Sequence, residues 1–154
     1  MQWKDMKKKM GNGEAINKYI YNVPFEITES LVNNGQDTSK TLTIKGTAIN
    51  AIKTRNGVKY TSEELKKSAP SLRNKPILKD HTNSVDSIVG RTTENVIFNE
   101  SMNRVEFEAK IMDVKTKEMI LDKRITSVSI GATVKELHDI SEEEGGGVIA
   151  EGID

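Results

Sequence analysis

The 154-residue chain contains no cysteine, which excludes disulfides, thiolate catalysis, Cys-ligated zinc and Cys-ligated iron–sulfur clusters. Aromatic residues make up only 5% of the chain, which disfavours a sugar- or peptide-binding barrel lined by exposed rings. The net charge is zero, with 23 basic and 23 acidic residues. No global excess of charge therefore draws the protein to nucleic acid or to anionic lipid, and we expect neither as a partner.

Long apolar runs are also absent. Runs such as those at residues 96–98 and 119–121 are broken within a few residues, far short of the ~20 that a membrane-spanning helix needs. The lysine cluster at residues 7–9 has no apolar stretch behind it, so it lacks the middle region of a secretory signal. We expect a soluble chain in which residues 1–18 form a flexible basic arm and residues 19–154 form one domain.

Alternation of apolar and polar residues predicts three strands, at residues 42–49, 104–111 and 125–134. Side chains of a strand point alternately to its two faces, so this pattern is typical of a sheet with one buried face. Gly46 interrupts the first of these segments, and a β-bulge is expected there.

Further strands are predicted from composition and turn signals. Residues 19–27 are rich in aromatic and β-branched side chains, and Pro24 among them favours an edge strand. Residues 85–98 read as a strand joined to the next one by a hairpin turn at residues 99–101. Residues 148–150, which follow an acidic, glycine-rich loop, begin a last strand.

Two helices interrupt the strands. Thr61 and Glu64 form a capping-box pattern, which predicts a helix over residues 62–69 that Pro70 ends. Residues 113–123 have a weakly helical period and an aspartate at the cap position. The fold class is therefore mainly β: an antiparallel β-barrel with short helices packed outside it.

Few residues could carry chemistry. The histidines His81 and His138 do not occur in a zinc-binding spacing, and the glycines at 145–147 lack the lysine and helix of a phosphate-binding loop. We expect no metal and no cofactor. Serine chemistry needs a hydroxyl within reach of an imidazole, and His81, at the end of a short apolar run, and Ser129, in a predicted strand, could supply the pair.

Three motifs resemble the capsid-maturation (prohead) proteases of tailed phages and archaeal viruses, which share the fold of the herpesvirus protease assemblin. The Gly-Thr-Ala at residues 46–48 matches the opening strand. The segment Asn-Lys-Pro-Ile-Leu-Lys-Asp-His at 74–81 is followed by Ile-Val-Gly-Arg at 88–91, and Ser-Val-Ser-Ile-Gly-Ala occupies 127–132. The resemblance covers residues 42–134 in order.

The resemblance implies roles for particular residues. Ser129, rather than Ser127, matches the nucleophile, and His81 matches the general base. The third member of the triad is expected on the strand after the nucleophile strand, where Asp154, Glu151 and His138 are the candidates within the chain. Of these, Asp154 is the residue we assign, and a residue beyond the end of the sequence is a further alternative. His138 is interpreted as a solvated loop residue.

The resemblance also implies an activity: a serine endopeptidase that cleaves viral scaffold and major capsid proteins, and itself, inside the assembling procapsid in the host cytoplasm. A homodimer or a higher oligomer is compatible with the family. The alternative is a noncatalytic β-rich virion structural or scaffold-binding module that keeps the fold without a working triad.

Overall fold

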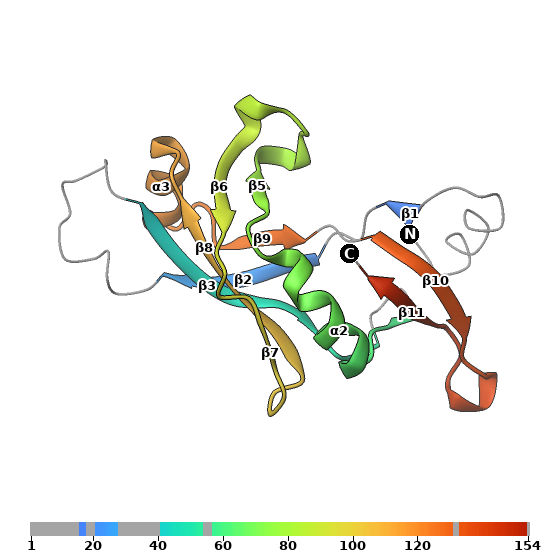
Figure 1. Cartoon of the computed structure of the whole chain (residues 1–154). Coiled ribbons are helices and arrows are strands. Elements are labelled where there is room, and N and C mark those ends of the chain that lie inside the picture. Colours follow the sequence, from blue (N-terminus) through green and yellow to red (C-terminus); the bar gives the residue numbers. More distant parts are fainter. Residues whose placement is uncertain (1–15, 18–20, 28–40, 54–56, 131–132, 154) are drawn as a thin grey trace.

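The computed structural model describes residues 16–17, 21–27, 41–53, 57–130 and 133–153, in which the chain forms two sheets and two α-helices (Figure 1). The larger sheet has the spatial order β5 (Pro76–Leu78), β6 (Ile88–Thr92), β8 (Arg104–Ile111), β3 (Leu42–Asn50), β2 (Tyr21–Ile27) and β9 (Ser127–Ile130), with β7 (Ile97–Asn99) paired to β8. The smaller sheet has the order β1 (Ile16–Asn17), β10 (Thr133–Asp139), β11 (Val148–Ile153) and β4 (Val58–Lys59). All pairs of strands are antiparallel except β11 with β4.

The helical elements lie between and beside these strands. The α-helices are α2 (Ser62–Ser68) and α3 (Val114–Leu121), and the 3₁₀ helices are η2 (Ala69–Leu72), η3 (Lys79–His81), η4 (Val85–Ser87) and η5 (Glu142–Glu144). In Figure 1, α2 lies between the two sheets, and it contacts β11 of the smaller sheet as well as β7 and β8 of the larger one. Helix α2 therefore joins the two sheets.

The mainly β, antiparallel character predicted from the sequence is confirmed, but a closed barrel is not found among the described residues. The larger sheet runs as an open path that ends at β5 and β9. The reason lies in the segment predicted as one strand at 125–134, which forms two strands, β9 and β10, in different sheets. Because β10 leaves to pair with β11, hydrogen bonding does not continue from β9 around to β5.

The clearest strand prediction is confirmed in detail. In β8 the buried positions alternate with partly exposed ones from Arg104 to Ile111, as the sequence pattern indicates. Its neighbour β3 carries a bulge between Thr47 and Ile49, close to but not at Gly46. The extra residue, Ala48, is almost fully buried, so the bulge keeps a small side chain in the core.

Other strand predictions differ from the structure. Strand β2 is not an edge strand, because β9 pairs with its first half and β3 with its second half. The segment 85–98 is not one strand but η4, β6 and β7 in succession. The hydroxyl of Thr93 accepts a hydrogen bond from the Asn95 amide at 3.1 Å, and this local turn separates β6 from β7.

Both predicted helices are present, and both begin at the predicted cap. The Thr61 hydroxyl accepts from the Glu64 amide at 3.3 Å, and the Asp113 carboxylate accepts from the Thr116 amide at 2.9 Å. The second half of the expected capping box is different, because the Glu64 carboxylate accepts hydrogen bonds from Lys67 and from the Gly152 amide. Glu64 therefore lies in the first turn of α2 and also connects this helix to β11.

The core lies where the inner faces of β3 and β8 meet α2 and the smaller sheet. Its largest fully buried side chains are Tyr60, Ile44, Leu65, Ile111, Val58, Val96 and Val148. These residues come from both sheets, from α2 and, for Tyr60 and Val96, from the segments next to β4 and β7, and they belong to one apolar cluster.

We predict that Leu65→Ala lowers the free energy of unfolding by about 2–5 kcal/mol, because the removed atoms leave a cavity where α2 meets both sheets. Leu65 is 1% exposed. The matched control is Leu121→Ala in α3, where the side chain is 53% exposed and the cost should stay below about 1 kcal/mol. Urea unfolding followed by circular dichroism measures both, and equal losses in the two variants would contradict this account of the core.

Candidate functional site

The structure places the backbones of His81 and Ser129 at opposite margins of the larger sheet. His81 is the last residue of η3, which directly follows β5, and Asp80 before it has a positive φ of 52°. Ser129 lies in β9, opposite Asn22 of β2. The side chains of His81 and Ser129 and the whole of Asp154 lie outside the described residues, so the expected contact between the serine and the histidine stays a prediction.

The two described side chains of strand β9 lie in different environments. Ser127 is exposed, whereas Val128 packs against the core. Ser127 lies opposite Pro24, which has no backbone N–H to donate to the ladder. In the described part of β9, the polar side chain of Ser127 therefore faces solvent, and the apolar side chain of Val128 anchors the strand to the core.

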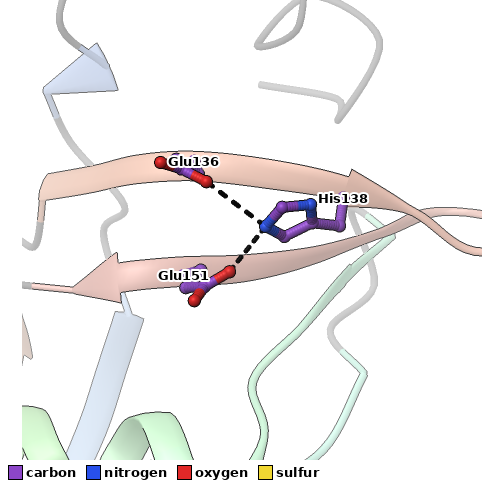
Figure 2. A group of neighbouring side chains, drawn as sticks. All are labelled: Glu136, His138 and Glu151. Carbon is purple, nitrogen blue, oxygen red and sulfur yellow. Dashed lines mark hydrogen bonds and ion pairs between the residues drawn. The ribbon is translucent and has the colours of Figure 1, made fainter.

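Two other candidates from the sequence are in contact with each other. His138 lies in β10 and Glu151 in β11, and His138 Nε2 is 2.5 Å from Glu151 Oε2 (Figure 2). The side chain of His138 is 51% exposed, as expected, but it lies on a strand and not in a loop. Glu151 was one candidate for the third triad residue, which would orient His81. His81, however, follows β5 of the larger sheet, whereas Glu151 lies in the smaller sheet.

Glu136 completes this group, and the sequence reasoning missed it. Its Oε2 atom is 3.5 Å from His138 Nε2, and Figure 2 shows both carboxylates directed toward the imidazole. Glu136 and His138 alternate along β10 and so share a face, and Glu136 is paired directly with Glu151 across the ladder. The sequence alone carried no sufficient signal for this pairing, because the register of β10 with β11 decides which residues face each other.

A shallow cleft of about 270 Å³ adjoins this group, between α2 and the hairpin of β10 and β11. Its lining is mostly charged and comprises Glu64, Lys67, Ser68, Lys135, Glu136, Glu151, Gly152 and Ile153. The two carboxylates of the group, Glu136 and Glu151, therefore line this cleft, together with further acidic and basic side chains.

Glu64 forms the floor of this cleft and holds α2 to β11. It is only 8% exposed, and its carboxylate accepts from the Gly152 amide at 3.0 Å and from Lys67 Nζ at 3.1 Å. Burial raises the pKa of Glu64, but the hydrogen bonds from Lys67 and Gly152 outweigh it, so the pKa lies below its ordinary value. The same pairing raises the pKa of Lys67.

Gly152 can make this contact because of its backbone. Its φ of +66° is in the left-handed region, and a Cβ there would lie 2.8 Å from the Cβ of Lys135. A side chain at this position would therefore be strained and would also collide with β10. Glycine is required where β11 presents its amide to Glu64.

Comparison with protein-family models, with curated proteins and with solved structures found no match. Neither α-helix in the part of the chain that the structure describes has the length and apolar character needed to cross a bilayer.

We predict that the stability of the protein depends on pH through Glu64. Because the folded state lowers the pKa of this carboxyl, its ionised form stabilises the fold above the ordinary pKa near 4.5, and this contribution is lost as the pH falls through the folded-state value. Glu64→Gln should reduce the free energy of unfolding at pH 7 by about 1–3 kcal/mol, and the difference from the unsubstituted protein should shrink between pH 5 and pH 3.

The control for this prediction is Glu118→Gln, which removes an exposed carboxylate from α3. Urea unfolding at a series of pH values measures all three proteins. A Glu64→Gln deficit that stays constant from pH 7 to pH 3 would show that the charge of Glu64 does not stabilise the fold.

Proposed function

We propose that the protein is a serine endopeptidase of the prohead-protease type, with Ser129 as nucleophile and His81 as general base. The observation that carries the proposal is the order of the larger sheet. Its two marginal strands are β5, which is followed directly by the 3₁₀ helix ending at His81, and β9, which bears Ser129. The sequence motifs around both residues support the same assignment.

The margins of a sheet suit a peptide substrate. The outer side of a marginal strand has backbone N–H and C=O groups that are not used within the sheet, and an extended peptide can pair with them as an additional strand. The proposal requires the two margins of the larger sheet, whose described hydrogen bonding forms an open path, to approach each other through the twist of the sheet. On this arrangement, a substrate bound along either margin would bring its scissile bond near both residues.

The chemistry requires no cofactor. The Ser129 hydroxyl attacks the carbonyl carbon of the scissile peptide bond while His81 accepts the hydroxyl proton, and a tetrahedral oxyanion forms. When this intermediate collapses, the C–N bond breaks and His81 donates the proton to the leaving amine. Water then hydrolyses the resulting ester, with His81 again acting as the base, and the serine is regenerated.

The third member of the triad orients His81. Asp154 is our assignment, with Glu151 of β11 as the alternative. The proposed substrates are viral scaffold and major capsid proteins and the flanks of the protease itself, cleaved within the assembling procapsid in the host cytoplasm. The second candidate function, a noncatalytic virion structural or scaffold-binding module, is favoured by no specific contact in the described residues.

We predict that Ser129→Ala reduces processing of co-expressed scaffold and capsid proteins by roughly 10⁴-fold or more, because nucleophile and base act as one unit. The loss of one hydroxyl from a strand should change the free energy of unfolding by no more than ~1 kcal/mol. His81→Ala should be as damaging to activity as Ser129→Ala. Gel analysis of the co-expressed proteins measures processing.

The matched control is Ser127→Ala, which removes an exposed hydroxyl two residues earlier on the same strand and should leave processing intact. A fluorophosphonate probe, located by peptide mass spectrometry, should label Ser129 in the unsubstituted chain and in the control. Comparison of Asp154→Asn with Glu151→Gln identifies the third member. Undiminished processing by Ser129→Ala would end the protease assignment in favour of the noncatalytic module.

A further inference from the structure

The hairpin of β10 and β11 places two carboxylates in an unfavourable position. Glu136 and Glu151 are directly opposed in the antiparallel ladder, and like charges in this position destabilise a pair of strands. Their side chains are 67% and 49% exposed, so the repulsion is screened by water but not removed. A cation between the two carboxylates would convert this repulsion into attraction.

The ammonium of Lys67 is engaged elsewhere. The charge of Lys67 acts on Glu151, but its ammonium donates its hydrogen bond to Glu64 at 3.1 Å. The stem of Lys135 packs along Gly152. The group that does lie between the two carboxylates is the imidazole of His138, with Nε2 directed toward both.

The spacing of these atoms suits a divalent metal. One ligand atom from each of Glu136, His138 and Glu151 lies within 4.8 Å of the other two. Tetrahedral zinc with bonds of about 2.0–2.1 Å holds its ligand atoms ~3.4 Å apart. The distance from Glu136 Oε2 to His138 Nε2 is already 3.5 Å, and the 2.5 Å contact between His138 and Glu151 would have to open by ~1 Å.

We infer that Glu136, His138 and Glu151 form a Zn²⁺ site at the solvent-exposed face of the hairpin. One imidazole nitrogen with two carboxylate oxygens suits zinc, whereas Ca²⁺ and Mg²⁺ take oxygen ligands. Three protein ligands leave the fourth position open for water or for a donor atom from another molecule. The His138 Nε2 atom coordinates without a proton, so the hydrogen shared with Glu151 moves to Nδ1 or to solvent.

This site differs from the zinc arrangement considered from the sequence, which required both histidines. The ligands come from two strands, and cross-strand pairing, not spacing along the chain, brings them together. The expected effect of the metal is to tie β10 to β11, because an ion that binds only the folded state stabilises it. The inference does not rest on the protease assignment, since Ser129, His81 and the assigned third residue Asp154 are not among the zinc ligands. Glu151 is shared only with the alternative choice of third triad residue.

Isothermal titration calorimetry of the purified full-length chain with ZnCl₂ tests the site. We expect one Zn²⁺ per chain and a melting temperature that rises with Zn²⁺ and returns to its original value with EDTA. His138→Gln, Glu136→Gln and Glu151→Gln should each weaken binding by roughly 10-fold or more, since the loss of even an outer partner of a metal ligand has an effect of this size. All three side chains are exposed, so these variants should fold, and circular dichroism checks that they do.

Two control variants separate this site from adventitious binding. Glu142→Gln removes a carboxylate from the acidic turn of η5, and His81→Gln removes the other histidine. Both should bind Zn²⁺ as tightly as the unsubstituted chain. Unchanged binding by His138→Gln, loss of binding in either control, or no saturable binding below about 1 mM Zn²⁺ would each overturn the inference.

Discussion

The packing of α2 against both sheets is the contact on which the rest of the structure depends. Leu65 of this helix is fully buried in the common core, and the Glu64 carboxylate beside it accepts the Gly152 amide of β11. Leu65 stabilises the packing by burying apolar surface, whereas Glu64 positions β11 by a charge-assisted hydrogen bond. Without this contact, the smaller sheet would be joined to the larger one chiefly by the connecting chain and by the apolar cluster.

The position of β11 in turn determines the polar surface of the smaller sheet. Held by Glu64 at Gly152, β11 pairs with β10 in the register that opposes Glu136 and Glu151. The opposite face of the same hairpin carries Val148 and Ala150, both fully buried. A one-residue slip would move these apolar side chains to solvent, so the burial of one face fixes which charged groups meet on the other.

Glu151 is a ligand of the proposed zinc site and also the alternative third residue of the proposed triad. Its carboxylate contacts His138, and a metal bound by that pair would reduce the negative charge with which Glu151, as the alternative third residue, would orient His81. If Asp154 is the third triad residue, as we propose, this competition does not arise, because Glu151 then interacts only with groups of the β10–β11 hairpin and its surroundings.

The sequence by itself determined the class of the fold and most of its elements. The alternation in residues 104–111 predicted β8, and the caps at Thr61 and Asp113 predicted the starts of both α-helices, because these signals are local and depend on neighbouring residues alone. The sequence also indicated His138 and Glu151, each as a separate candidate for the third triad residue. These predictions needed no information about which strands are neighbours.

Only the tertiary structure decided how the strands combine. The segment 125–134 alternates throughout, yet its two parts belong to different sheets, and this change of partner opens the expected barrel. The Glu64 side chain was predicted to complete a local capping box, but it accepts a hydrogen bond from the Gly152 amide, which is 88 residues away in the chain. The group of Glu136, His138 and Glu151 likewise exists only through the register of β10 with β11. Pairing between strands is a long-range choice made by burial and hydrogen bonding together, so residue patterns within a single strand do not specify it.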